Sequence, residues 1–158
     1  MIVTRTMEFP MGHRLATHMG LCRHIHGHNY RVQVNVSGER DINGIVIDFK
    51  ALKEILADVF DKYDHALVLA GDDPVVGAYM IDVDGGRLTA DQAGFGNIIA
   101  VPFAPTAENL AEYWMEELQR VFHARRRDAG DMYSLIVHSV TVWESSTTSA
   151  MAVAGGEA

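Results

Sequence analysis

Residues 24–37, His-Ile-His-Gly-His-Asn-Tyr-Arg-Val-Gln-Val-Asn-Val-Ser, are the stretch that decides the fold. From residue 29 onward, polar and apolar side chains alternate: Asn29, Arg31, Gln33 and Asn35 share one parity, and Tyr30, Val32, Val34 and Val36 share the other. This alternation predicts a β-strand with one buried face and one exposed face. We therefore expect a sheet that is covered on one side.

The sequence on either side of this strand predicts further extended segments. Residues 2–9 alternate weakly and are predicted to form a strand that Pro10 and Gly12 interrupt. Asn43-Gly44 is typical of a tight turn, and the flanking residues predict a hairpin that continues as a strand at 45–47.

Two stretches carry the three- and four-residue spacing of amphipathic helices. Asp48 is predicted as the N-cap of the first helix, which runs to about residue 62. Pro105-Thr106 opens the second helix, with Thr106 as its N-cap, and Gly130 ends it. The side chains predicted to face the core are Phe49, Leu52, Ile55, Leu56, Val59 and Phe60 in the first helix, and Leu110, Tyr113, Trp114, Leu118, Val121 and Phe122 in the second.

The connection formed by residues 70–104 shows no single helical or strand period. Gly85-Gly86 predicts a turn within it, and residues 79–83 and 97–101 are predicted as extended pieces. We interpret the connection as an insertion or extension of the domain.

The C-terminal part of the chain completes an α+β pattern. Residues 133–144 predict a long strand rich in Val and Ile, and residues 150–154 predict a short strand after a turn. The resulting order is β-β-α-α-β-β. It predicts a single domain, residues 1–158, with an antiparallel four-stranded sheet and two helices on one face.

Composition excludes several classes of protein. The net charge of −8 argues against a nucleic-acid-binding protein, and no stretch approaches the ~20 apolar residues of a membrane span. The single cysteine cannot form an intrachain disulfide. The N-terminal residues do not resemble a secretory signal. We expect a cytoplasmic protein with no membrane partner.

Histidines cluster near the start of the chain, since five of the eight lie between residues 13 and 28. His24, His26 and His28 alternate and so share one face of the predicted strand. Two imidazoles at this spacing can converge on one zinc ion, with His13 or His18 as a third ligand. Three protein ligands leave a position open, as in catalytic zinc sites. The spacing favours a metal site over an exposed His-rich strand, but it leaves the ligand set open.

Cys22 precedes this cluster and has three interpretations. A lone cysteine is commonly a small buried hydrophobic residue. Its neighbour Arg23 and a nearby metal cation would instead favour the reactive thiolate. It could also be a fourth zinc ligand, which would close the site and indicate a structural metal.

Two other places in the sequence carry acid–base chemistry. Asp64-His65 pairs a carboxylate with an imidazole that it can orient for proton transfer. A histidine that stabilises the end of the preceding helix explains the pair equally well. Glu144 ends the long late strand, where a carboxylate can bind the N2/N3 edge of a pterin, although an exposed strand edge is the simpler explanation.

Six short motifs, in order over most of the chain, resemble the 6-pyruvoyl-tetrahydropterin synthase family and its bacterial 6-carboxytetrahydropterin synthase branch. Each motif is short, but together they form a specific pattern. They are residues 9–15 (Phe-Pro-Met-Gly-His-Arg-Leu), 22–28 (Cys-Arg-His-Ile-His-Gly-His), 46–53 (Val-Ile-Asp-Phe, then Leu-Lys), 63–65 (Tyr-Asp-His), 105–109 (Pro-Thr-Ala-Glu-Asn) and 142–145 (Val-Trp-Glu-Ser).

The resemblance implies roles that spacing alone leaves open. It implies that His13, His26 and His28 bind Zn²⁺, and that His24 does not. It also implies that Cys22 abstracts a proton rather than binding the metal.

The resemblance extends to the rest of the site and to the assembly. It implies that Asp64 and His65 form a second acid–base couple and that Glu144 anchors the pterin, with Thr106 as a further substrate-binding residue. The family has the tunnelling fold, in which subunits join their sheets into barrels. The implied assembly is a homohexamer of two trimers with active sites at subunit interfaces.

The activity implied by the resemblance is a zinc-dependent lyase reaction on 7,8-dihydroneopterin triphosphate. The expected products are 6-carboxy-5,6,7,8-tetrahydropterin, acetaldehyde and triphosphate, on the route to queuosine and other deazapurine nucleosides. The alternatives are 6-pyruvoyl-tetrahydropterin synthase activity and a non-catalytic zinc- or pterin-binding protein. Because the chain is acidic, a local basic patch must bind the triphosphate, and the candidates are Arg14, Arg23, Arg31 and Lys50.

Overall fold

The computed structural model describes residues 1–78, 81–83, 86–88, 96–129 and 135–155. The predicted turn at Gly85-Gly86 and the helix end at Gly130 fall wholly or partly outside these residues. In chain order the strands and helices are β1 (Ile2–His13), β2 (His26–Ser37), α1 (Phe49–Phe60), β3 (Ala66–Ala70), α2 (Pro74–Ala78), β4 (Ile81–Val83), β5 (Gly86–Leu88), β6 (Asn97–Val101), α3 (Ala107–Ala129), β7 (Ile136–Trp143) and β8 (Ser149–Val153). Short 3-10 helices occupy Leu21–Arg23 and Asp61–Tyr63.

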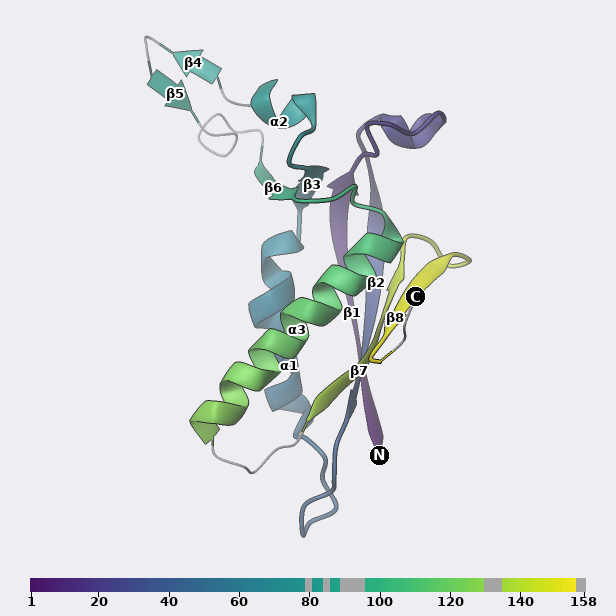
Figure 1. Cartoon of the computed structure of the whole chain (residues 1–158), viewed down its shortest axis with the longest axis vertical. Coiled ribbons are helices and arrows are strands. Elements are labelled where there is room, and N and C mark those ends of the chain that lie inside the picture. Colours follow the sequence, from purple (N-terminus) through teal and green to yellow (C-terminus); the bar gives the residue numbers. More distant parts are fainter. Residues whose placement is uncertain (79–80, 84–85, 89–95, 130–134, 156–158) are drawn as a thin grey trace.

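The main sheet has six strands in the order β6-β3-β1-β2-β7-β8 (Figure 1). Strands β1, β2, β7 and β8 form the antiparallel arrangement that the sequence predicts. The prediction of a four-stranded, wholly antiparallel sheet is nevertheless wrong. Strands β3 and β6 are added at one edge, and β3 runs parallel to both β1 and β6.

The two additional strands explain the long connection. β3 is the short apolar run Ala-Leu-Val-Leu-Ala, which lacks the alternation that reveals a half-exposed strand. Parallel neighbours need a crossover between them, so the chain must leave β3 and return before β6. The chain between Ala70 and Asn97 makes this crossover, and its described part includes α2 and the separate β4–β5 pair.

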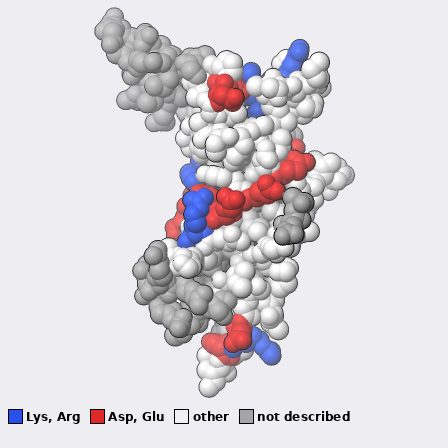
Figure 2. Space-filling view, in the orientation of Figure 1, with Lys and Arg blue, Asp and Glu red and all other residues white. Residues whose placement is uncertain are grey.

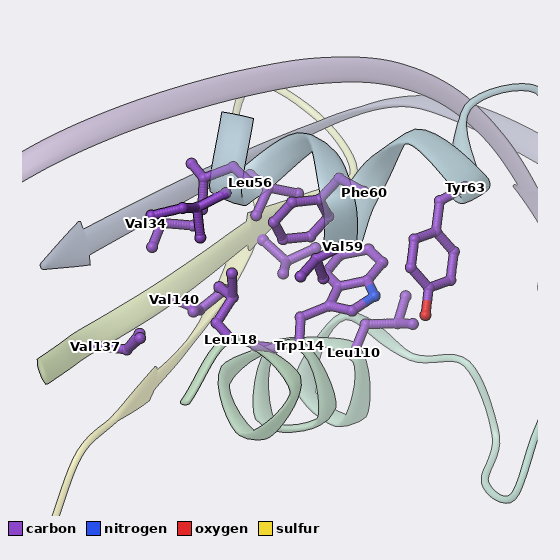
Figure 3. Packing of buried hydrophobic residues seen from close by; sticks show 14 of the residues in the cluster. Val34, Leu56, Val59, Phe60, Tyr63, Leu110, Trp114, Leu118, Val137 and Val140 are labelled. Atoms are coloured by element: carbon purple, nitrogen blue, oxygen red, sulfur yellow. The ribbon is translucent and has the colours of Figure 1, made fainter. Parts of the chain in front are cut away.

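Helices α1 and α3 cover one face of the sheet, as predicted (Figure 1). Tyr30 and the three valines after it on β2 are fully buried on this face. In Figure 3, Trp114 of α3 lies among side chains of α1, close to Phe60 and Tyr63, whose ring centroids are 5.3 and 5.2 Å from its own. The core therefore packs both helices against β2. This packing also sets the end of the sheet at which α3 begins.

Both predicted N-caps are present. The Asp48 carboxylate accepts hydrogen bonds from the backbone N–H groups of Lys50 and Ala51. The Thr106 hydroxyl accepts one from the backbone N–H of Asn109, at 3.2 Å. Phe49 is a correction, because its side chain is 63% exposed although it was expected in the core.

Pro10 and Gly12 do not interrupt β1, in contrast to the prediction. The Pro10 carbonyl oxygen accepts a hydrogen bond from the His65 N–H, so the nitrogen of Pro10 also faces the β3 edge. β1 pairs with β3 only at Gly12 and His13. The missing N–H of proline therefore removes no bond between β1 and β2.

The predicted hairpin with a strand at 45–47 is also absent. The Asp41 carboxylate accepts hydrogen bonds from the backbone N–H groups of Asn43 and Ile45. Its own N–H donates to the Ile45 carbonyl. These bonds close a compact loop around the predicted Asn43-Gly44 turn, so the backbone of residue 45 is not available to a sheet.

The outer side of α3 is acidic. Glu108, Glu112 and Glu116 recur every fourth residue and are exposed, and Figure 2 shows a band of acidic side chains across this face. In the described part of the chain, no helix is long and apolar enough to cross a membrane.

Candidate metal centre and its surroundings

Three histidines converge where β1 ends and β2 begins. His13, the last residue of β1, pairs across the ladder with His26, the first residue of β2. His28 follows two positions later and so shares the face of His26. One ligand nitrogen from each residue lies within 4.8 Å of the other two. The ladder thus brings together the triad that the family resemblance implied, on the helix-covered face.

Hydrogen bonds set the orientation of two of these rings. His13 Nδ1 donates to the Pro105 carbonyl oxygen at 2.8 Å, and His26 Nδ1 donates to the His24 carbonyl oxygen at 2.8 Å. Each bond leaves Nε2 as the unprotonated nitrogen of a neutral ring. Such contacts to the second nitrogen are typical of metal-bound histidines.

The separation of the two Nε2 atoms fits a shared metal ion. They lie 3.1 Å apart. Two tetrahedral zinc ligands with Zn–N bonds of about 2.1 Å would lie about 3.4 Å apart. Two lone pairs at this distance repel unless a cation or a proton lies between them. The donor set therefore fits a metal ion that prefers imidazole ligands.

Burial favours the neutral form of His13, which is the form that binds a metal. Its side chain is only 2% exposed, and removal from water lowers its pKa below the usual value of 6.5. The hydrogen bond to Pro105 and the nearby Glu144 carboxylate oppose this effect without reversing it.

The remaining residues of the histidine cluster stand outside the triad. His24 contributes its backbone carbonyl to His26. His18 Nδ1 accepts a hydrogen bond from the Gly20 N–H in an exposed loop. Cys22 lies half-buried in the 3-10 turn, and its thiol is not part of the group of atoms within 4.8 Å of one another. Among the described residues, the geometry thus favours His13 over His18 as the third ligand.

Glu144 lies beside the triad, as the interpretation of a substrate-binding carboxylate requires. Its Oε1 is 3.8 Å from His13 Nε2. The hydroxyl of Tyr30 donates a hydrogen bond to the same oxygen at 3.2 Å. Tyr30 was not among the site residues predicted from the sequence. The available signal was its parity, because Tyr30 shares the strand face of His26 and His28.

Asp64 and His65 form a pair, but not at the triad of their own chain. His65 Nδ1 donates to Asp64 Oδ1 at 2.7 Å, and both side chains are largely exposed. His65 lines a shallow hollow together with Gly12 and Gly27. Most of the lining on β1 and β2 (Pro10, Gly12, Gly27 and Asn29) has the parity opposite to that of the triad, so the hollow opens mainly on the helix-free face of the sheet, although His28 of the triad also lines it.

The backbone of His65 is unusual. Its φ of +58° lies in the left-handed region, which non-glycine residues adopt at a cost. Strain of this kind persists where the surrounding structure demands it, commonly at functional sites. Here the hydrogen bond from its N–H to the Pro10 carbonyl fixes that conformation at the start of β3.

The candidate phosphate-binding residues have different surroundings. Arg14 forms an ion pair at 2.8 Å with Asp73, a carboxylate with a fully buried side chain. Arg31 lies over the Trp143 ring, with its guanidinium carbon 4.3 Å from the ring centroid. Lys50 is exposed in the first turn of α1, and Arg23 is exposed next to His24. Arg14 and Arg23 belong to neighbouring segments, since the Leu15 N–H donates to the Cys22 carbonyl oxygen at 2.8 Å.

Comparisons with known proteins place the chain in a family. A family model for 6-pyruvoyl tetrahydropterin synthase matches residues 2–154. The protein named 6-carboxy-5,6,7,8-tetrahydropterin synthase in Haemophilus influenzae is 29% identical over 151 residues, which cover 92% of this chain and 94% of that relative. The protein of the same name in Rickettsia felis is 32% identical over 117 residues, or 73% of this chain and 78% of the relative.

A solved structure shows the same fold. The 6-pyruvoyl tetrahydropterin synthase of Caenorhabditis elegans aligns with a TM-score of 0.63 at 24% identity, over 98% of this chain and 96% of that chain.

Proposed function

Because the chain belongs to the 6-pyruvoyl tetrahydropterin synthase family, we propose that it is a zinc-dependent lyase acting on 7,8-dihydroneopterin triphosphate. The products are 6-carboxy-5,6,7,8-tetrahydropterin, acetaldehyde and triphosphate. The names of the relatives in Haemophilus influenzae and Rickettsia felis support the carboxy product.

The observation that carries the proposal is the convergence of the nitrogens of His13, His26 and His28. Three imidazoles with one open position are the ligand set of several catalytic zinc sites. When bound, zinc would act as a Lewis acid on the hydroxyls of the substrate side chain and so acidify neighbouring bonds.

Cys22 and Glu144 supply the functions that the triad lacks. Cys22 Sγ removes a proton from the substrate side chain. The Glu144 carboxylate accepts two parallel hydrogen bonds from the N2/N3 edge of the pterin, an interaction strengthened by its charge. Thr106 assists in substrate binding. Its Oγ1 accepts the capping hydrogen bond of α3, and its hydroxyl hydrogen can donate to the substrate.

The Asp64–His65 couple moves the second proton. The bond from His65 Nδ1 to Asp64 orients the ring and leaves Nε2 to exchange protons with the substrate. The hollow that His65 lines opens mainly on the sheet face opposite the triad, and we propose that His65 of one subunit serves the triad of another. The active enzyme is therefore an oligomer, which we propose to be a hexamer of two trimers.

The test is turnover of purified, zinc-loaded protein on 7,8-dihydroneopterin triphosphate, with the products identified by mass spectrometry. Formation of 6-carboxytetrahydropterin with acetaldehyde is the expected result. A 6-pyruvoyl product would assign the sister activity to the same site. No turnover by protein that binds zinc stoichiometrically would contradict the proposal.

A further inference from the structure

Tyr30 connects the metal triad to the candidate pterin anchor. Its side chain is fully buried. Its ring packs edge-on against His13 and His28, with centroids 5.7 and 5.6 Å away. Its hydroxyl donates to Glu144 Oε1 at 3.2 Å. Because the Tyr30 ring is packed on two sides, its hydroxyl has little freedom to move. The Glu144 carboxylate that accepts its hydrogen bond is therefore also held in place.

Glu144 stands near the metal ligands without joining them. Its Oε1 is 3.8 Å from His13 Nε2, yet the carboxylate is not within 4.8 Å of all three ligand nitrogens. A glutamate oxygen is itself a good zinc ligand. The carboxylate is therefore close enough to the triad that it would compete with the substrate for a metal held by the three histidines.

We propose that Tyr30 is a positioning residue whose hydroxyl keeps the Glu144 carboxylate out of the metal's coordination sphere and directed toward the substrate. The inference rests on the proposed function, because it assumes that Glu144 serves the substrate rather than the metal. In the described part of the chain, the Tyr30 hydroxyl is the side-chain donor bonded to this carboxylate.

Removal of the hydroxyl has opposite consequences for the two ligands. In Tyr30→Phe the ring still packs against His13 and His28, but Glu144 loses its hydrogen bond. The carboxylate then becomes a fourth metal ligand, so the metal binds more tightly. The same movement takes the carboxylate from the pterin, so substrate binding weakens.

The experiment is a titration of metal-free protein with cobalt(II), followed by its visible spectrum and by competition with a chelator. Tyr30→Phe should bind the metal on the order of tenfold more tightly, the lower end of effects caused by residues just outside a ligand shell. Its cobalt spectrum should shift. Tyr63→Phe is the matched control, because Tyr63 is also a buried tyrosine but its ring packs against Trp114 rather than against the triad histidines, and it should match the parent protein.

Two further variants separate the proposed role from a general loss of structure. Tyr30→Phe combined with Glu144→Gln should lose the gain in metal affinity, because a neutral amide is a poor ligand. Glu144→Gln alone should resemble this double variant. In turnover assays Tyr30→Phe should raise KM about tenfold and leave kcat within about twofold, as loss of a positioned binding group predicts.

Unchanged cobalt affinity and spectrum in folded Tyr30→Phe would overturn the inference. So would a gain in affinity that persists with Glu144→Gln. The metal titration does not depend on turnover, so the inference about Tyr30 can fail while the proposed reaction stands. If the parent protein bound cobalt but did not turn over the pterin, the proposed function would fail instead.

Discussion

His13 and His26 are held by backbone carbonyl oxygens rather than by carboxylates. Pro105 and His24 supply these carbonyls from the main chain. Substitution of the side chains of Pro105 and His24 can therefore leave the two hydrogen bonds to the histidine rings intact. The structure therefore distinguishes His24, which orients a ring through its carbonyl oxygen, from the proposed metal ligands themselves. The sequence alone does not make this distinction.

We predict that His26→Ala abolishes stoichiometric metal binding, whereas His24→Ala preserves it. Loss of a direct ligand should weaken zinc affinity by more than the roughly 10–100-fold cost of losing an outer-shell partner. Metal content per chain and competition with a chromophoric chelator measure the effect. A His24→Ala protein that loses its metal would contradict the assignment of the triad.

Substitution of Cys22 tests whether metal binding and proton abstraction belong to different residues. Its thiol lies outside the triad, so Cys22→Ala should retain full metal content. If Cys22 is the proton-abstracting base, turnover should fall by roughly 10²–10⁴, the usual contribution of a general base. Parallel loss of zinc and activity would instead support Cys22 as a ligand.

At the residue level, the sequence predicts which residues are candidates for the site better than it predicts which residues contact one another. The alternation of His26 and His28 and the apolar parity of Tyr30 can be inferred from spacing. The choice of His13 over His18 required the family resemblance, because it depends on the register of two strands. The contact between Tyr30 and Glu144 joins residues that are 114 positions apart in the sequence, so no local sequence pattern predicts it.

The pairing of β1 with β2 brings Gly12 opposite Gly27, directly between the triad residues. A Cβ on Gly27 would meet the Met11 carbonyl oxygen at 3.2 Å, closer than ordinary packing allows. That oxygen belongs to the backbone of the neighbouring strand and cannot easily move. The close approach of the two strands therefore depends on this glycine.

We predict that Gly27→Ala lowers the free energy of unfolding by about 1–3 kcal/mol, as insertion of a methyl group into a tight site usually does. It should also weaken metal binding, because it displaces His26 and His28. Gly71→Ala is the control, since its Cβ would meet the Val101 carbonyl oxygen at an ordinary 3.5 Å. Chemical denaturation and zinc titration of both variants provide the measurements, and equal stability of the two would contradict the prediction.

Elements with a clear period are predicted well, and elements without one are missed. The β2 alternation and the stripes and caps of α1 and α3 all have local signals, and apart from Phe49 the structure confirms them. β3 has none, because both of its neighbours are parallel strands and its sequence is uniformly apolar. The loop at 45–47 was mistaken for a strand because the hydrogen bonds of Asp41 compete with sheet formation there.

In the whole molecule, the proposed catalytic groups are divided between the two faces of one sheet. The triad and Glu144 lie on the helix-covered face, whereas His65 lines the hollow on the helix-free face. Under the proposed function, two chains would meet so that the couple of one and the triad of the other act on one substrate. No sequence pattern expresses this division, because it depends on the placement of β3 next to β1.

The measurement that tests this account most directly is complementation between two inactive variants. His26→Ala and His65→Ala chains, carrying different affinity tags, are co-expressed, and mixed oligomers are purified through both tags. Each chain supplies the half that the other lacks. If sites are shared between subunits, random mixing should restore turnover of 7,8-dihydroneopterin triphosphate at about a quarter of the sites, as expected for an interface built from two different patches. Mixed oligomers no more active than either variant alone would contradict the shared site.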